Sequence, residues 1–247
     1  MTTSSVVSGV ADAVRGRGAA VVPNFLTGDR LASLKQHADD LLSGTHALRF
    51  PKSTRVWDLY RHGPPFVDLL MHRQLSELIA ELLGENYLLS DYSLNAVNPH
   101  QPQDDWHLDY PFNEMTALVQ GGLLGVQCVL TLDEFTNENG ATQYLPGSHR
   151  PARRPDPSAT RACTTIAAPA GSLLIMAAST WHRSGYNSTR RARAGVLLSF
   201  IERWIRPMTD PPEPGLWSAT PALRLLLGME RPPETINGLP IDGTDLP

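Results

Sequence analysis

The chain has 247 residues, of which 41% are hydrophobic and 19% charged, and its formal net charge is −4. This balance is typical of a globular protein with a sizeable core, and it excludes a disordered or fibrous chain. The charge gives no reason to expect nucleic acid or an anionic membrane as a partner. Two cysteines, Cys128 and Cys163, are too few for a disulfide framework. No signal-peptide pattern or membrane-length apolar run is present, so we expect one cytoplasmic domain over residues 1–247, with its oligomeric state open.

The first third of the chain is expected to be mainly helical. Residues 1–17 are small and polar and predict a loose N-terminal tail with a short helix, and Ala19–Val22 predicts a strand. Apolar residues at helical spacing predict a helix that begins near Thr27 and a second helix over residues 66–83. Gly84 is the expected end of that second helix, because glycine is common just after a helix.

Strands dominate the rest of the chain. Apolar runs bounded by Gly, Pro, Asn or Asp predict strands over residues 87–97, 125–133, 171–177 and 194–204. Helices that come early and strands that come late indicate an α+β protein, with the helices on one side of a mainly antiparallel sheet system. Residues from about 207 to 247 are proline-rich and predict a C-terminal extension with one short helix, to which we assign no chemistry.

The segment Trp106-His107-Leu108-Asp109-Tyr110 contains the first candidate metal ligands. If this segment is a β-strand, His107 and Asp109 project to the same face. His182, much later in the chain, can complete a set of two imidazoles and one carboxylate. That set leaves three adjacent positions of an octahedron open, which is the geometry of non-heme Fe(II) oxygenases. A His-x-Asp pair is weak evidence alone, so its surroundings matter.

A predicted turn brings an arginine towards His182. If Asn187 and Ser188 form the centre of a hairpin, Arg193 lies across from His182. Ser184 shares the strand face of His182, so its hydroxyl can offer a hydrogen bond to a molecule bound beside His182 and Arg193.

Taken in chain order, the His107 and Asp109 pair, residues 139–150, His182 and Arg193 resemble the phytanoyl-CoA dioxygenase family of iron- and 2-oxoglutarate-dependent oxygenases. The resemblance runs from about Gly18 to Trp204. It implies a double-stranded β-helix, also called a jelly roll or cupin-like fold, with buttressing N-terminal helices. It also implies Fe(II), 2-oxoglutarate as cosubstrate and dioxygen, in a reaction that couples decarboxylation of 2-oxoglutarate to oxidation of a substrate C–H bond. Hydroxylation is the default outcome, and desaturation or ring formation would need only a different substrate pose.

The resemblance gives each of these residues an expected role. His107, Asp109 and His182 would hold the iron, while Arg193, assisted by Ser184, would bind the far carboxylate of 2-oxoglutarate. Arginine suits this task because its planar fork makes two parallel charge-assisted hydrogen bonds. Family members frequently have glutamine two residues before the first histidine.

In this chain that glutamine position is Asp105, a carboxylate that would be unfavourable beside an anionic cosubstrate. The resemblance therefore leaves the cosubstrate contacts on that side open.

Three aromatic residues are candidates to line a substrate pocket: Tyr110 and Phe112, which follow the metal-binding segment, and Trp57. Aromatic side chains belong more often to a core. His149 follows a Pro-Gly-Ser turn, so we expect a structural role for it and not a ligand role. The sequence does not identify the substrate; we expect a small to medium organic molecule, either a secondary metabolite or a derivative of an amino acid.

Two alternative functions use the same residues. A zinc hydrolase would use two histidines and an aspartate to activate water, and would need neither 2-oxoglutarate nor Arg193. A jelly roll can also serve as a small-molecule binding module without catalysis. Formation of succinate from 2-oxoglutarate in the presence of iron distinguishes the three functions.

Overall fold

The computed structural model describes residues 3–103, 105–117, 122–150, 162–212, 219–230, 235–236 and 239–240. Most of the predicted C-terminal extension beyond residue 212 therefore lies outside the described residues. Its short helix is described as α5 (Pro221–Leu226), close to the predicted position.

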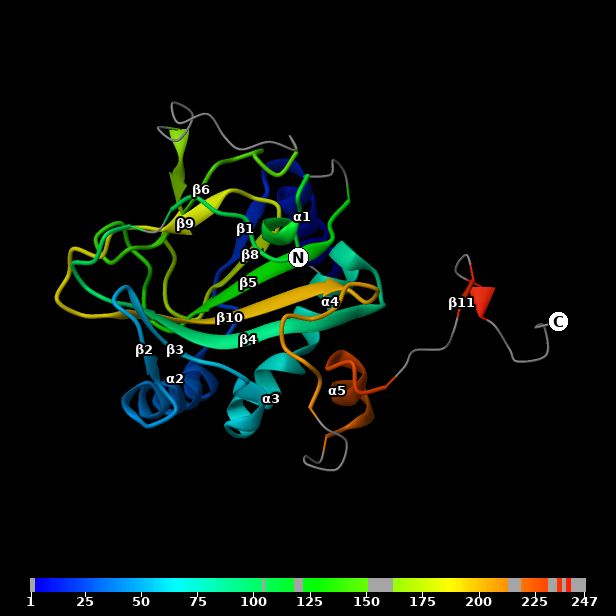
Figure 1. The fold of residues 1–247 in the computed structure, drawn as a ribbon, viewed down its shortest axis with the longest axis horizontal. Helices are drawn as coiled ribbons and strands as arrows, with labels where there is room; N and C mark the ends of the chain where they lie inside the picture. The colour runs from blue at the N-terminus through cyan, green and yellow to red at the C-terminus, as the bar shows by residue number, and fades with distance from the viewer. Residues whose placement is uncertain are drawn as a thin grey trace.

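Two antiparallel sheets form the framework (Figure 1). The large sheet has seven strands, in the spatial order β1 (Ala19–Val22), β8 (Leu173–Ala177), β5 (Gly125–Thr131), β10 (Arg193–Glu202), β4 (Tyr87–Val97), β3 (Ser53–Val56) and β2 (Leu48–Arg49). The small sheet has three strands, in the order β7 (Thr164–Thr165), β6 (Thr142–Tyr144) and β9 (His182–Ser184). A separate two-stranded sheet pairs β11 (Thr235–Ile236) with β12 (Leu239–Pro240).

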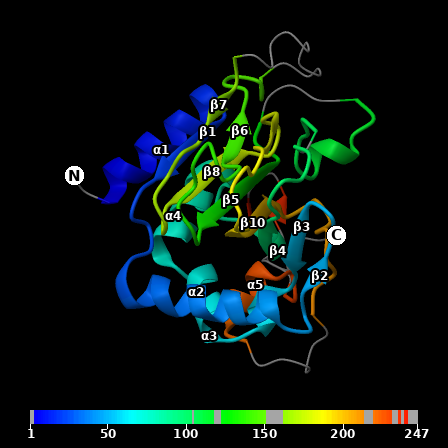
Figure 2. The same cartoon turned by 90° about the vertical axis from the view of Figure 1, so that its left-hand side faces the viewer.

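The helices pack against one face of the large sheet, and the small sheet lies on the other side. The helical elements are α1 (Thr3–Arg17), α2 (Gly28–Ser43), α3 (Pro64–Leu70), α4 (Arg73–Leu83) and the 3-10 turns η1 (Leu59–Arg61) and η2 (Phe112–Glu114). Figure 1 shows β6 and β9 above the large sheet and α2 and α3 below it. Figure 2 shows α1 running beside β1 and β8 at one edge. The described helices include none that is both long and apolar enough to cross a membrane.

Side-chain alternation along β10 shows how one strand serves both faces. Val196, Leu198 and Phe200 are at most 1% exposed and join the core beneath the helices. Arg193 and Ser199 point to the opposite face, because residues two apart share a face of a strand. The largest hydrophobic cluster thus occupies the helix side of the sheet. The other side carries a smaller cluster that includes Val129, Phe135 and Met176, and it also carries the polar residues of the cavity.

The predicted fold class is confirmed, and the strands agree with prediction to within a few residues at their ends. The short helix expected within residues 1–17 is present but longer than predicted, since the helix α1 takes up residues 3–17 and the loose tail is wrong for them. Val7, Ala11 and Val14 recur at helical spacing and are buried against the rest of the core. Their small size obscured an amphipathic pattern that the tertiary packing makes effective.

The helix predicted over residues 66–83 is two helices, α3 and α4. The break occurs because His72 adopts an extended conformation, with φ −66° and ψ 120°, and its ring packs on Phe25 with centroids 4.5 Å apart. This turn lets both helices direct their leucines into the same core. Gly84 ends α4 at a positive φ of 81°, as predicted.

Candidate metal centre

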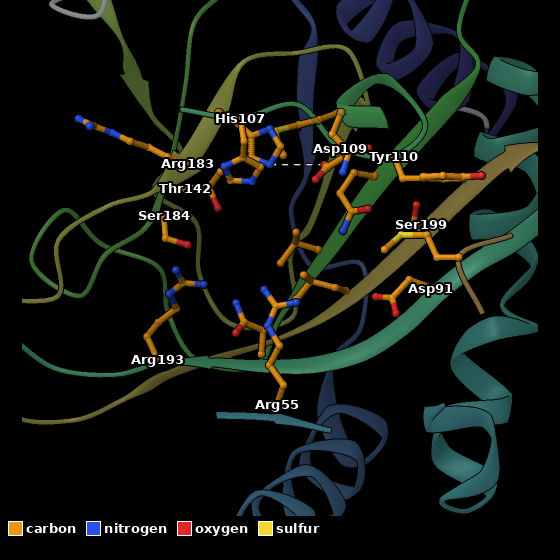
Figure 3. Close-up of a pocket in the computed structure, with 18 residues that line it drawn as sticks. Arg55, Asp91, His107, Asp109, Tyr110, Thr142, Arg183, Ser184, Arg193 and Ser199 are labelled. Carbon is orange, nitrogen blue, oxygen red and sulfur yellow. Dashed lines mark ion pairs between the residues drawn. The ribbon is translucent and has the colours of Figure 1, made fainter. Parts of the chain in front are cut away.

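His107, Asp109 and His182 converge between the two sheets (Figure 3). One ligand atom from each lies within 4.8 Å of the other two, and the Nε2 atom of His182 is 3.4 Å from the Oδ2 atom of Asp109. The two imidazole rings are tilted against each other with centroids 4.4 Å apart. Two nitrogens and one oxygen therefore face a common point.

The backbone reaches this arrangement without the strand that the sequence predicted around residues 106–110. His107 forms only a single antiparallel bridge to His182. The amide of His107 donates to the carbonyl of His182 at 3.0 Å, and the amide of His182 donates to the carbonyl of His107 at 3.1 Å. Asp109 lies beyond that bridge, and its amide donates to the carbonyl of Ala178 at 2.9 Å. The expected strand is thus wrong, because the chain turns away after one residue, but the two side chains still reach one point.

The hydrogen bonds of the two histidines fix their tautomers for metal binding. The Nδ1 atom of His107 lies 2.9 Å from the carbonyl oxygen of Asp105, and the Nδ1 atom of His182 lies 2.9 Å from the carbonyl oxygen of Thr180. A carbonyl only accepts, so each Nδ1 carries the proton and each Nε2 offers a lone pair. Such outer hydrogen bonds are the usual support of metal-bound histidines.

The carboxylate completes the test for a metal. The Oδ2 atom of Asp109 is buried and has no hydrogen-bond partner among the described residues, although an unpartnered buried carboxylate oxygen is costly. A divalent cation held jointly with the two Nε2 atoms would satisfy that oxygen. The residues present therefore fit a metal ion with open positions on its remaining sides.

A cavity of about 170 Å³ adjoins the three residues. Arg193, Ser184 and Thr142 line one end of it (Figure 3). Arg193 is 4% exposed, its guanidinium carbon lies 3.9 Å from the centroid of the Phe135 ring, and its Nη2 atom donates to the carbonyl of Gly140. A buried guanidinium held in this way is suited to an anionic ligand.

The predicted hairpin around Asn187 and Ser188 is wrong, since His182 and Arg193 belong to different sheets. His182 pairs with Tyr144 of β6, whereas Arg193 pairs with Val97 of β4. Between them the chain crosses from the small sheet to the large one. Asn187 stabilises this crossing, because its Nδ2 atom donates to the carbonyls of Val97 and Arg191 at 3.1 and 2.8 Å. Both side chains nevertheless line the same cavity, because the two sheets face each other.

Asp105 lies outside the cavity. Its side chain is exposed, and it is not one of the residues that line the cavity in the described part of the chain. Only its backbone carbonyl serves the site, through His107. The repulsion that its carboxylate would exert on an anionic cosubstrate is therefore reduced by distance and solvent.

The structure separates the three aromatic candidates. Tyr110 lines the cavity, and its hydroxyl donates to the carbonyl of Arg206. Phe112 is 3% exposed and packs in a small cluster with Leu108. Trp57 lies edge-on to Phe50, with centroids 6.1 Å apart, and is not among the cavity-lining residues described.

His149 sits away from the three ligand candidates. Its Nε2 atom is 2.9 Å from the carbonyl of Arg15 near the end of α1, so it ties a loop to that helix, as its turn sequence predicted.

Sequence reasoning missed a set of polar residues on the cavity face of the large sheet: Arg55, Asp91, Asn95, Gln127 and Ser199. The available signal was polar residues at alternate positions of otherwise apolar strands, as in Asp91 and Asn95 of β4. Burial raises the pKa of Asp91; the Ser93 hydroxyl and the charge of Arg55 oppose this, while Asp58 and Asp109 add to it.

A jelly roll that presents two imidazoles and one carboxylate between its sheets defines a class of metalloproteins with a facial three-residue site. The family model described as Phytanoyl-CoA dioxygenase (PhyH) matches residues 14–195, well over half of the chain. The chain belongs to this family.

Curated relatives and solved structures agree with the assignment. Dioxygenase trt7 of Aspergillus terreus is 26% identical over 85% of this chain and 80% of its own, and dioxygenase cdmA of Talaromyces verruculosus is 27% identical over 71% and 61%. The chain spans only 57% to 61% of the length of the first curated relatives that it matches. The epimerase SnoN, solved with Fe3+, α-ketoglutarate and nogalamycin RO, has a TM-score of 0.70 at 18% identity and covers 98% and 97% of the two chains. That likeness shows the fold.

Proposed function

We propose that this protein is an Fe(II)- and 2-oxoglutarate-dependent dioxygenase that hydroxylates a C–H bond of a small organic molecule. One observation carries the proposal: two lone-pair-bearing Nε2 atoms, an unpartnered carboxylate oxygen and a buried arginine border a single cavity. Family membership and dioxygenases among the relatives support it.

The residues divide the work between metal and cosubstrate. His107, Asp109 and His182 would hold the iron, and Arg193 would bind the distal carboxylate of 2-oxoglutarate with help from the Ser184 hydroxyl. When bound, iron and 2-oxoglutarate supply the oxidising chemistry, in which dioxygen is consumed and 2-oxoglutarate is converted to succinate and CO2. The protein supplies the orientation of the bound groups within the cavity.

The arginine is what favours a dioxygenase over a zinc hydrolase. Hydrolysis by a metal-activated water needs no cation at the far end of the cavity. Arg193 lies on the large sheet and the ligand candidates lie on or beside the small sheet, so an elongated ligand can span from one to the other. A keto acid with a second carboxylate has this shape.

The test is formation of succinate from 2-oxoglutarate by protein loaded anaerobically with Fe(II) and then exposed to air. We expect succinate with Fe(II) and none with Zn(II) in its place. His107→Ala should lower metal content and reduce turnover by about 100-fold or more, since an outer partner of a ligand alone is worth about 10- to 100-fold. His37→Ala, which alters an exposed histidine of α2, is the matched control and should retain full activity. Full activity of His107→Ala, or equal turnover with Zn(II), would contradict the proposal.

A further inference from the structure

The end of the cavity opposite Arg193 carries a row of three polar side chains, Asp91, Ser199 and Gln127, here called the polar row. They are consecutive register partners on the central strands: Asp91 on β4 lies opposite Ser199 on β10, which lies opposite Gln127 on β5. All three line the cavity. Figure 3 shows Asp91 and Ser199 on the far side of the cavity from Arg193 and Ser184.

The polar row has unused hydrogen-bonding capacity. Gln127 is 7% exposed and Ser199 is 5% exposed, yet neither side chain makes a hydrogen bond to another residue of the described chain. Asp91 accepts one side-chain hydrogen bond, from the hydroxyl of Ser93 to Oδ2 at 2.8 Å, which leaves Oδ1 without one from the described residues. Buried polar groups are normally paired, so Gln127 and Ser199, together with the half-engaged carboxylate of Asp91 beside them, indicate a ligand.

Asp133 shows how the same fold uses a carboxylate for structure. Its Oδ1 atom is 2.7 Å from the Nζ atom of Lys35, and its Oδ2 atom accepts from the amide of Ala194 at 2.8 Å. Both oxygens are engaged. Asp91 differs because it lies on the cavity face and half of its carboxylate is unpartnered, so a structural role does not account for it.

The charge of Asp91 restricts what can bind there. The metal already has its own carboxylate in Asp109, and the anionic cosubstrate would be repelled by a second one. The charged groups that act on Asp91 are Arg55 and the carboxylates Asp58 and Asp109. Arg55 lines the cavity without an ion pair to another described residue. The complementary ligand is cationic and rich in donors.

We propose that the polar row binds a protonated primary amine of the substrate, so that the enzyme oxidises small aminated molecules. An ammonium group has three N–H donors and no acceptor. The polar row offers three acceptors, the Asp91 carboxylate, the Ser199 hydroxyl oxygen and the Gln127 amide oxygen, and one of them carries the opposite charge. This inference rests on the proposed function, since it assigns the substrate of the same site.

The experiment measures binding and not turnover. Protein is loaded with Mn(II) and 2-oxoglutarate, then titrated by calorimetry with benzylamine and n-butylamine, each matched to the alcohol of the same skeleton, benzyl alcohol and n-butanol. We expect at least one amine to bind about tenfold or more tightly than its alcohol, because a charged hydrogen bond is stronger than a neutral one. Asp91→Asn, which keeps the shape and removes the charge, should abolish that preference.

A matched control separates a local effect from a general loss of charge. Glu202→Gln removes a carboxylate from the same strand as Ser199, but Glu202 does not line the cavity and should leave the preference unchanged. Ser199→Ala should weaken amine binding about threefold, as for loss of one hydrogen bond. It also provides the test if Asp91→Asn does not fold.

The outcomes distinguish this inference from the proposed function. If wild-type protein does not bind Mn(II) and 2-oxoglutarate, the proposed function is wrong. If it binds both, but neither amine binds more tightly than its alcohol, the inference about the polar row is overturned. Retention of the amine preference by Asp91→Asn overturns it as well.

Discussion

The two faces of the large sheet carry opposite chemistry although the same strands build both. On the helix face, β5 and β10 contribute Cys128 and Leu198, which lie opposite each other and are fully buried. On the cavity face the same strands contribute Gln127, Ser199 and Arg193. Because successive residues of a strand point to opposite faces, one set of side chains can stabilise the fold while the alternate set lines the cavity.

This separation means that a change on one face should leave the other property largely intact. Apolar burial on the helix face supplies stability in proportion to area. The cavity face lowers stability instead, because Gln127 and Ser199 lose hydration there without a hydrogen bond from another described residue. Substitutions along β10 and in the loop before it test whether the two faces act independently.

The largest effect is expected at Arg193. Arg193→Ala should raise the 2-oxoglutarate concentration for half-maximal succinate formation by about 30-fold or more, since truncating one partner of a buried charge pair costs about 2–5 kcal/mol. Initial rates against 2-oxoglutarate concentration give the value. Arg190 is an exposed arginine of the loop before β10, and Arg190→Ala should leave the 2-oxoglutarate requirement unchanged. An unchanged requirement in Arg193→Ala would place the anchor elsewhere.

The opposite face of β10 gives the complementary result. Leu198→Ala should lower the free energy of unfolding by about 2–5 kcal/mol, because Leu198 is 0% exposed and the cavity left behind collapses only partly. Urea denaturation measures the loss. The 2-oxoglutarate requirement of the folded enzyme should stay as in wild type, and a strong rise would show that the two faces are coupled.

A smaller and mixed effect is expected at Asn187, which stabilises the crossing between the sheets. Asn187 is 1% exposed and donates to the backbone carbonyls of Val97 on β4 and of Arg191 in the crossing segment. Asn187→Ala should cost about 1–3 kcal/mol of stability, because carbonyls lose their donors. It should also raise the 2-oxoglutarate requirement severalfold by loosening Arg193. Kinetics that match wild type would show that β4 alone positions Arg193.

The sequence predicts the long elements well because their signals are local. The strands β4, β5, β8 and β10 are apolar runs bounded by turn residues, and these bounds need no knowledge of neighbours. The length of the helix α1 was underestimated because Val7, Ala11 and Val14 are too small and too few to stand out until the core that covers them is known.

The residues of the candidate site also fall into those that the sequence predicts and those that only the fold brings together. His107, Asp109 and His182 were predicted from the resemblance to the family, because a His-x-Asp pair alone is weak evidence, and the structure brings the three together. The polar row was missed, since its three members come from three strands and only the register brings them together. The predicted hairpin between His182 and Arg193 was wrong for a related reason. A turn sequence does not reveal that the segments before and after it join different sheets.

The two free cysteines, Cys128 and Cys163, report on the helix face directly. Burial raises the pKa of Cys128 far above its usual range, and the thiolate is the reactive form, whereas Cys163 is partly exposed. In native protein, iodoacetamide should therefore label Cys163 first, with Cys128 labelled only through opening of the sheet, as mass spectrometry of peptides over time will show. Because Leu198 lies opposite Cys128 in the register, Leu198→Ala should speed labelling of Cys128 by about 30-fold or more, in line with a loss of about 2 kcal/mol or more when opening is at equilibrium. Arg193→Ala alters the other face and should change that rate far less. Equal acceleration by both substitutions would mean that the two faces of the sheet do not act independently.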